Sequence, residues 1–227
     1  MLRQVGTPEG TLITANYQTA GRGQRSNVWQ SEAGKNILCT YILKPTWLGI
    51  ERQFSLNKAV ALAVQRTIQT FCAPNSVWIK WPNDVLVNNS KVAGILIENT
   101  LSGGQIVSSL TGIGMNVNQL HMSVEGRNVC SIADVLKQAV SLEAVQDELS
   151  SQLEAVYFRL RNGNDKAINQ EFAEVLYKRG ERCVFESNEG LRNYIVRGVS
   201  EQGQLVVEDL EGNVIEFQHG EVHMVMK

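Results

Sequence analysis

The clearest pattern of apolar and polar positions lies in the middle of the chain, where it predicts a strand followed by a hairpin. Bulky apolar residues recur at every second position of 77–81, as in a half-buried strand. Pro82 ends this strand because proline has no N–H to donate to a ladder. Two apolar runs, 85–87 and 91–97, then flank the turn-prone triplet Asn88-Asn89-Ser90, which predicts a short hairpin.

The rest of the first half predicts three more strands and one helix. β-Rich runs indicate strands at 11–17, 36–43 and 105–117. Apolar residues at helical spacing indicate a helix from Ser55, as its N-cap, to about Phe71.

The second half changes from helices to short strands at Gly180. Helices are predicted at 131–138, 143–161 and 165–178, and the second of them carries an apolar stripe. The stripe consists of Val145, Leu149, Leu153, Val156 and Leu160. Strands are then predicted near 182–186, 193–200, 204–209, 214–218 and 222–226. Turn signals separate them, as in a small closed β-barrel, so we expect two domains, 1–179 and 180–227.

Composition argues against several classes of protein. The chain has 227 residues, 43% of them hydrophobic and 19% charged, and its net charge of −2 gives no sign of a nucleic-acid footprint. The N-terminus lacks the apolar core of a signal peptide, and no run approaches the roughly 20 apolar residues of a membrane helix. The four cysteines stand singly, without the spacing of a disulfide framework or a zinc site. We therefore expect a cytoplasmic protein with reduced thiols.

The first candidate for chemistry is the pair of lysines in the central stretch. Lys80 and Lys91 stand among bulky apolar residues, with Asp84 between them in the sequence. Burial of a lysine is costly without an anionic partner, and a bound anion would provide one. A surface hairpin with solvated lysines is the alternative, and the residue types leave both interpretations open.

The second candidate is the polar loop 18–27, which contains glycines and ends at Trp29. Glycine allows backbone N–H groups to approach a ligand closely, and Arg22 and Arg25 offer planar forks, so the loop suits a phosphate or a carboxylate. For an isolated Gly-Arg-Gly triplet, however, a solvated surface loop is the commoner explanation.

The third candidate is the glycine-bearing strand 105–117. At a period of two, Gly112, Gly114 and Asn116 share one face of this strand. Glycines weaken a strand interior, so they mark a bulge or a place where a ligand approaches the backbone. Tight packing against the helix that begins near Ser55 is the alternative.

Three segments, AGRGQRSNVW, KWPNDVLVNNSKVAGILIE and GIGMNVN, resemble in order and spacing the biotin protein ligases. The resemblance covers nearly the whole chain from about Gly10 and implies an α+β fold. The implied architecture is a class II synthetase-like mixed β-sheet flanked by helices, followed by a small SH3-like β-barrel. The implied activity uses biotin and Mg-ATP to form biotinyl-5'-adenylate and pyrophosphate, and then transfers biotin to a lysine of a biotin carboxyl carrier protein.

The resemblance also implies roles for individual residues. Biotin would contact Gln18, Gly21, Arg22, Gly23, Gln24, Lys91, Gly94, Leu96, Gly112 and Gly114. ATP would contact Arg25, Trp29, Lys80, Asn83, Asp84, Lys91 and Asn116. Lys91 and Arg22 would be the catalytic cations, and Asp84 would hold Mg²⁺.

The chain departs from the family pattern at two places. Many relatives carry arginines at the positions of Gln24 and Asn27, so this loop has less positive charge, for which Arg25 would compensate. The family also has a Ser-Thr-Asn segment well ahead of the loop that binds the biotin ring, and only twenty residues precede Gly21 here, none of which matches. We therefore expect that Met1 is an internal or wrongly chosen start.

Two alternatives to a biotin ligase stay open at this point. A lipoate or octanoate transferase would share the fold but lacks KWPND, and a non-catalytic adenylate-binding protein would release no pyrophosphate. The DNA-binding domain of some relatives is not found in this sequence, so we expect no nucleic-acid partner. We also expect no membrane association, because no apolar run is long enough for a membrane helix. The chain is expected to be a monomer, or a homodimer paired through an exposed sheet edge.

Overall fold

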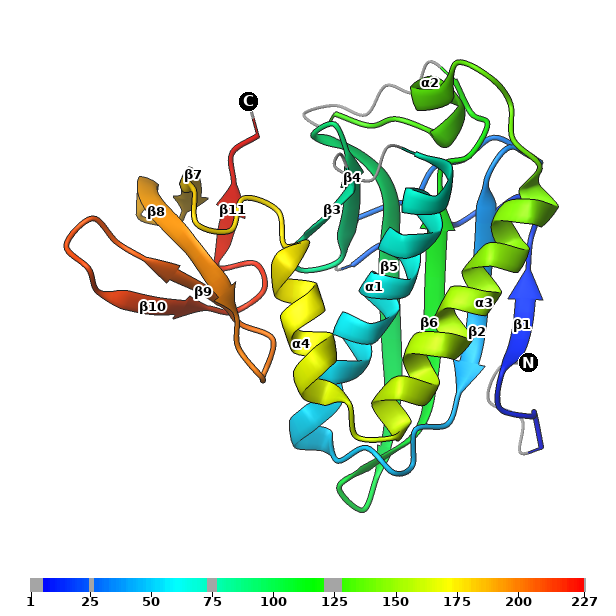
Figure 1. Cartoon of the computed structure of the whole chain (residues 1–227), viewed down its shortest axis with the longest axis horizontal. Coiled ribbons are helices and arrows are strands. Elements are labelled where there is room, and N and C mark those ends of the chain that lie inside the picture. The colour runs from blue at the N-terminus through cyan, green and yellow to red at the C-terminus, as the bar shows by residue number, and fades with distance from the viewer. Residues whose placement is uncertain (1–5, 25–26, 73–76, 121–127, 227) are drawn as a thin grey trace.

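The computed structural model describes residues 6–24, 27–72, 77–120 and 128–226. Their strands form two sheets, of six and five strands, and helices cover one face of the larger sheet (Figure 1). Among the described residues, none of the helices combines the length and apolar character that a membrane crossing requires. The predicted α+β class is confirmed.

The six-stranded sheet has the order β1-β2-β6-β5-β4-β3. Its strands are β1 (Thr11–Thr14), β2 (Ile37–Leu43), β3 (Val77–Lys80), β4 (Asp84–Val87), β5 (Ser90–Ser102) and β6 (Gln105–Met115). All their ladders are antiparallel, which corrects the predicted mixed sheet. Parallel pairing occurs only at isolated bridges among the described residues, such as that of Ile79 with Leu176. The sheet is antiparallel because its strands follow one another through tight turns rather than long crossovers.

The central hairpin between β4 and β5 forms at the predicted turn. Asn88 and Asn89 both have positive φ, at 47° and 65°, as a two-residue type I′ turn requires. Asparagine tolerates this left-handed region better than most residues. The Asn-Asn pair therefore fixes the register of the two strands that carry Asp84 and Lys91.

Four α-helices accompany the larger sheet in the described part of the chain. They are α1 (Gln53–Phe71), α2 (Ile132–Leu136), α3 (Leu142–Arg161) and α4 (Asp165–Glu174). The prediction of Ser55 as an N-cap was wrong, because the short 3₁₀ helix η1 (Ile50–Arg52) leads directly into α1 and leaves Ser55 inside the first turn. Helix α4 ends before residue 178 because Val175 and Tyr177 bond instead to the backbone of Ile79, at 2.8 Å each.

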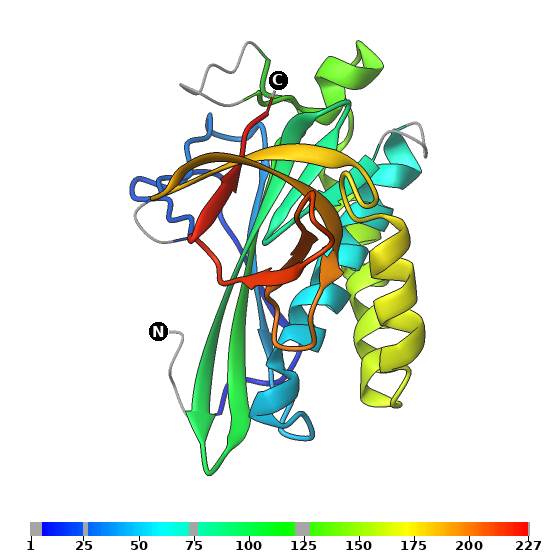
Figure 2. The ribbon, with the colours of Figure 1, turned by 90° about the vertical axis from the view of Figure 1, so that its left-hand side faces the viewer.

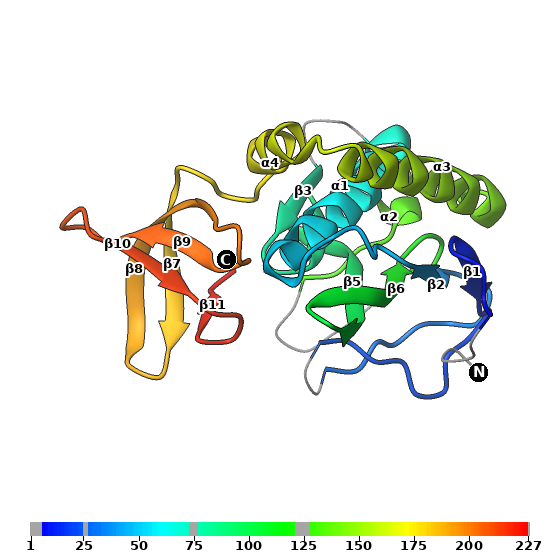
Figure 3. The same ribbon diagram turned by 90° about the horizontal axis from the view of Figure 1, so that it is seen from below.

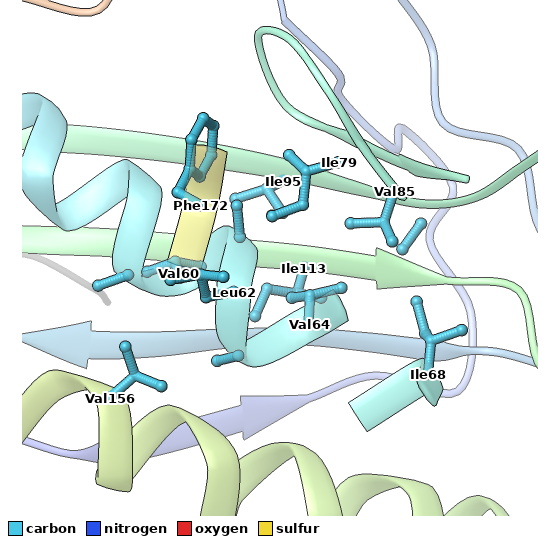
Figure 4. Packing of buried hydrophobic residues seen from close by; sticks show 14 of the residues in the cluster. Val60, Leu62, Val64, Ile68, Ile79, Val85, Ile95, Ile113, Val156 and Phe172 are labelled. Carbon is cyan, nitrogen blue, oxygen red and sulfur yellow. The ribbon is translucent and has the colours of Figure 1, made fainter. Parts of the chain in front are cut away.

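Helices α1, α3 and α4 lie on the same face of the larger sheet (Figure 3). The side chains between them include Val60 and Val64 of α1, which pack toward Ile95 and Ile113 of the sheet (Figure 4). All five residues of the predicted α3 stripe are buried, as expected for a helix that turns one apolar side to the core. Because this face is covered, the opposite face of β5 and β6 is the one left for a site.

The second sheet has the order β10-β9-β8-β7-β11. Its strands are β7 (Arg182–Ser187), β8 (Gly190–Val199), β9 (Leu205–Glu208), β10 (Val214–Phe217) and β11 (Val222–Met224), close to the predicted positions. The sheet is open rather than a closed barrel, because the short strands β10 and β11 stand at its two ends and pair only with β9 and β7. Figure 2 shows it facing the viewer, in front of the larger sheet. The domain division at Gly180 remains a prediction.

A charged cluster joins the three helices on the outside of the core. The Glu171 carboxylate of α4 accepts bonds from Arg159 of α3, at 2.5 Å, and from Arg66 of α1, also at 2.5 Å. The Arg159 guanidinium, and then the charge of Arg66, hold the pKa of Glu171 below its usual value of 4.5. A carboxylate with a lowered pKa stabilises the fold above pH 4.5, and this contribution is lost as the pH falls through the folded-state pKa.

We predict that Glu171→Gln lowers the free energy of unfolding at pH 7 by about 1 kcal/mol, because each side chain of the cluster is roughly one-third exposed and the pairs are partly screened. Urea unfolding of both proteins at pH 7 and at stepwise lower pH measures this. The difference between the two proteins should shrink below pH 4.5. Glu174→Gln, on the exposed side of the same helix, is the control, and a difference independent of pH would contradict the assignment.

Candidate functional site

A cavity of about 900 Å³ opens between the two sheets. One wall is built from the β3–β4 hairpin, the start of β5 and the loop 27–30. The other wall belongs to the second sheet and includes residues 222–226. Both lysines singled out from the sequence, Lys80 and Lys91, line this cavity together with Asp84.

Lys91 reaches the cavity because of a β-bulge. In the β4–β5 ladder Val85 pairs with Ala93, but Leu86 pairs with Lys91, so Val92 is the extra residue. A simple alternation would place Lys91 on the same face as Ala93, toward the helices. The extra residue turns the Lys91 side chain to the opposite face, because a bulge changes the alternation of side chains along the strand. The backbone carbonyl of Val92 is satisfied by the N–H of Asn116, at 2.8 Å.

The Lys91 ammonium lies 2.5 Å from Oδ1 of Asp84, with both side chains about four-fifths buried. The same ammonium lies 5.6 Å from the ring centroid of Trp29, a distance at which a cation is attracted to an aromatic ring. The anionic partner that the sequence required for Lys91 is therefore supplied within the chain, by Asp84. An incoming anion would have to compete with that carboxylate.

Gly94 and Gly114 form a flat floor beside this ion pair, and the indole ring of Trp29 lies on it. A Cβ added at Gly114 would be 2.5 Å from Cε2 of the indole, and one added at Gly94 would be 3.1 Å from its Cζ3. Any other residue at Gly114 would force the ring to shift. The two glycines are paired across β5 and β6, so they form one continuous surface.

The alternative that these glycines allow tight packing against the predicted helix was wrong. Ile113 and Met115, which point to the opposite face, are the buried residues that pack with α1. The structure shows a close neighbour at Gly114 and Gly94, while the approach of a ligand to these glycines stays a prediction. The approaching group in this structure is Trp29, which the sequence placed with ATP.

Backbone contacts close the glycine-bearing loop into a small hairpin. The N–H of Trp29 bonds to the carbonyl of Gly21, at 3.0 Å, and the N–H of Gly23 bonds to the carbonyl of Asn27, at 2.7 Å. A Cβ at Gly21 would collide with the carbonyl oxygen of Trp29. The glycines therefore serve first to bring Trp29 over the sheet.

Several residues expected in the site lie outside the cavity wall. Arg22 is exposed and pairs with Glu98 at 3.1 Å, and Gln18 is also exposed. Gly112 meets the backbone of Leu96, since an added Cβ would be 3.3 Å from its carbonyl oxygen. Leu96 does line the cavity. Arg25 lies outside the described residues.

The nucleotide side of the predicted site is more compact. Lys80 and Asp84 are cross-strand partners, and Asn83 lies in the turn between them. The Asn83 amide donates to the carbonyl of Ile95, at 2.8 Å, so it also ties this turn to β5. Asn116 is buried on the cavity wall, and its amide donates to the carbonyl of Cys130.

Two polar atoms at the cavity are buried without a hydrogen-bond partner in the described part of the protein. They are the acceptor Oε1 of Gln24 and the donor Nε1 of Trp29. A buried donor or acceptor left unpaired costs about 1 to 3 kcal/mol. A ligand that carries both an acceptor and a donor would relieve that penalty.

Neighbouring titratable groups are unsuited to act as nucleophiles. Burial raises the pKa of the Cys130 thiol to about 12, so it stays protonated at neutral pH. Burial also raises the pKa of Tyr177, whose hydroxyl donates to Asn89 at the hairpin turn. Neither side chain is therefore suited to act as a thiolate or a phenolate nucleophile at neutral pH.

The second wall of the cavity was missed by the sequence analysis. His219 packs edge-on against Trp81, with ring centroids 5.9 Å apart, and His223 and Met224 also line the cavity. His223 and Met224 belong to β11 of the second sheet, and His219 lies in the connection that leads to this strand. Their side of the cavity depends on how the two sheets dock, for which the sequence gives no local signal.

The cavity offers oxygen ligands for a magnesium ion, but not a complete protein cage. No cluster of three or more His, Cys, Asp or Glu side chains suited to a metal occurs among the described residues. Mg²⁺ is commonly held by one or two carboxylates together with phosphate oxygens and water. Asp84 on the cavity wall therefore fits a magnesium that arrives with a phosphate ligand.

Comparisons with known proteins place the chain among similar sequences. Residues 2–116 match the model of the Biotin/lipoate A/B protein ligase family. The chain is 43% identical over 112 residues to the bifunctional ligase/repressor BirA of Bacillus spizizenii, which covers 49% of this chain and 34% of that protein. It is 29% identical over 217 residues to the biotin–[acetyl-CoA-carboxylase] ligase of Mycobacterium tuberculosis, covering 94% and 79% of the two chains.

A solved structure shows the same fold. The biotin protein ligase of Aquifex aeolicus in complex with biotin and ATP superposes with a TM-score of 0.81 at 24% identity, covering all of this chain and 93% of that one. This likeness supports the predicted fold of both sheets.

We predict that Gly114→Ala displaces the indole of Trp29, because the new methyl group would overlap the ring. Gly114→Ala should shift the tryptophan emission to longer wavelength. The same substitution made in a Trp29→Phe protein should cause no shift. Overpacking of this kind costs about 1 to 3 kcal/mol of stability. Gly112→Ala, which does not touch the ring, is the matched control, and unchanged emission in Gly114→Ala would contradict the proposed contact.

Proposed function

The chain belongs to the Biotin/lipoate A/B protein ligase family, and from this premise we propose that it attaches biotin to a lysine of a biotin carboxyl carrier protein at the expense of ATP. In the first step an oxygen of the biotin carboxylate bonds to the α-phosphorus of ATP, and the bond to pyrophosphate breaks. In the second step the lysine amine bonds to the acyl carbon and loses a proton, and AMP leaves.

One observation carries this proposal, namely the ion pair of Lys91 and Asp84 beside the glycine floor. A carboxylate and a triphosphate repel each other, so their reaction needs a fixed positive charge between them. Lys91 stands where the floor of Gly94 and Gly114 meets the turn that carries Asn83 and Asp84. It can therefore contact the carboxylate and the α-phosphate together.

Binding of the substrates would exchange the partners of this ion pair. Lys91 would turn from Asp84 to the two anions, and the carboxylate released in this way would hold the magnesium ion. When bound, Mg²⁺ supplies charge that neutralises the departing pyrophosphate. Lys80 and Asn116 would hold the nucleotide on the same side of the cavity.

The glycine floor is the place we assign to biotin. Its ureido ring carries an acceptor oxygen and two N–H donors, which would pair with the buried Nε1 of Trp29 and Oε1 of Gln24. Trp29 covers the floor in this structure, so biotin entry would need a shift of the indole. Arg22 would join the site by leaving Glu98, an exposed pair worth about 0 to 1 kcal/mol.

The location and the oligomeric state of the protein are also part of the proposal. The chain spans only 34% of the first of its curated relatives and 46% of another, so the activity of the whole protein rests on the proposal. We propose action in the cytoplasm, as a monomer or as a homodimer. The exposed edge strand β1, with Leu12 and Ile13 more than one-third exposed, offers a surface for pairing.

We predict that the protein biotinylates a carrier domain when it is incubated with ATP, magnesium and biotin. Mass spectrometry of the carrier should show one added biotin, and replacement of the acceptor lysine by arginine should abolish the gain. Biotin-dependent pyrophosphate release should precede transfer. An unlabelled carrier under conditions in which a known ligase labels it would disprove the proposal, and nucleotide binding without pyrophosphate release would indicate a non-catalytic adenylate-binding protein.

We further predict that Lys91→Ala slows biotin-dependent pyrophosphate release by roughly 30- to 1,000-fold, because a charge-assisted contact to the transition state is worth about 2 to 4 kcal/mol. The loss of stability should be smaller than the loss of activity, since Asp84 lines the open cavity and can hydrate there once its partner is removed. Lys166→Ala, an exposed lysine of α4, is the control. A nearly normal rate in Lys91→Ala would refute the catalytic role.

A further inference from the structure

Lys58 of α1 is a buried lysine that the proposed reaction does not use. It is only 4% exposed. Its ammonium donates to Oδ1 of Asn169 at 3.0 Å, and to the backbone carbonyls of Ser200 at 3.2 Å and Val199 at 3.4 Å. Asn169 belongs to α4, whereas Val199 is the last residue of β8 in the second sheet and Ser200 follows it.

The surroundings of Lys58 compensate for the burial of its charge. An ammonium has three N–H donors, and these three acceptors match them in number. The rings of Phe54 and Phe172 lie 5.7 and 5.8 Å from the nitrogen, which adds cation–π attraction. Burial lowers the pKa of Lys58, and the nearby charge of Glu201 opposes that effect. The charge thus connects one helix of the larger domain to the backbone of the second sheet.

The segment that Lys58 holds, residues 199–204, also makes contact with the hairpin that lines the cavity. The indole Nε1 of Trp81 donates to the carbonyl of Gly203 at 2.8 Å. Gly203 has a φ of +92° and lies so close to the ring of Phe54 that an added Cβ would collide with it. The segment is ordered internally, since the N–H of Ser200 bonds to the carbonyl of Gln204 at 2.9 Å.

This contact lies next to the nucleotide side of the cavity. Trp81 follows Lys80 in the turn that also contains Asn83 and leads to Asp84 of β4, and its ring packs on His219 of the second wall. The second wall, including residues 222–226, is part of the sheet whose β8–β9 turn Lys58 anchors. The position of that wall therefore depends on the docking of residues 199–204.

We infer that Lys58 is a positioning residue for the nucleotide: by holding residues 199–204 against α1 and Trp81, it fixes the second sheet as the far wall of the ATP side of the cavity. This inference rests on the proposed function for its kinetic consequence. The glycine floor lies on β5 and β6 and receives no contact from Lys58, so the effect is confined to ATP.

The test compares Lys58→Met with the wild type. Methionine keeps the length and apolar stem but removes the three donors. We expect the KM for ATP in pyrophosphate release to rise about 5- to 20-fold, as the loss of one or two hydrogen bonds would cause. The KM for biotin and kcat should each stay within about 3-fold. Arg66→Met, which removes the ion pair of α1 with Glu171 of α4 and leaves the second sheet untouched, should leave all three values near those of the wild type.

A second measurement separates this inference from the proposed function. Hydrogen exchange of the Gly203 and Gln204 amides should accelerate about 10-fold or more in Lys58→Met, and titration with ATP alone should show weaker binding. Both readouts work whether or not the protein ligates biotin. If the wild type releases no pyrophosphate yet the exchange and ATP titration change as expected, the proposed function fails and the positioning role stands.

Gly203→Ala provides a second variant, because its methyl group would collide with the ring of Phe54 and displace residues 199–204 from α1. If Lys58→Met is too unstable to assay, Gly203→Ala should show the same rise in the KM for ATP. Equal increases in the KM for ATP and for biotin would overturn the inference, since they would indicate general loosening. An unchanged KM and affinity for ATP with accelerated exchange would overturn it as well, because the docked segment would then have no part in nucleotide binding.

Discussion

The site depends on one irregularity of the backbone, the β-bulge at Val92. Without this extra residue Lys91 would face the helices, where its charge would be buried without the carboxylate of Asp84. With it, the lysine, the carboxylate and the glycine floor share one face. The bulge is itself held in place, because Asn116 satisfies the carbonyl of Val92 and the backbone of residues 128–130 brackets Lys91 on both sides. The positive charge is thus positioned by the sheet and not by the flexibility of its side chain.

The glycine floor and the loop that ends at Trp29 are two parts of one arrangement. Gly94 and Gly114 leave a flat surface only because no Cβ fills it, and Gly21 lets the chain fold back closely enough to place the indole there. The ring covers the backbone of these glycines, yet its own Nε1 is left without a partner. A surface covered by a residue with an unsatisfied donor is suited to exchange that cover for a ligand.

Local sequence patterns predicted most strands and helices, but they did not predict how these elements contact one another. Strand and helix positions followed from periodicity, and the Asn88-Asn89 turn from the rare tolerance of asparagine for positive φ. The start of α1 was misplaced because η1 runs into it without a capping side chain, so no residue type marks the boundary. Residue types singled out Lys91 as a candidate for anion binding, but the face on which its side chain lies could not be predicted, since strict alternation places it on the wrong face. The contact of Trp29 with Gly94 and Gly114 could not be predicted from the sequence, because it depends on how the loop folds back on itself.

The second sheet shows why a site of this kind cannot be assigned from motifs alone. Its residues carry no recognisable pattern of ligand binding, but they complete the cavity because the sheet is docked through Trp81, a residue within the motif itself. Docking by Trp81 and Lys58 uses backbone carbonyls of residues 199, 200 and 203, and carbonyls are present whatever the side chains are. Apart from Gly203, whose backbone and lack of a Cβ matter, the side chains of this segment therefore take little part in the contact, whereas Trp81 and Lys58 donate through their side chains.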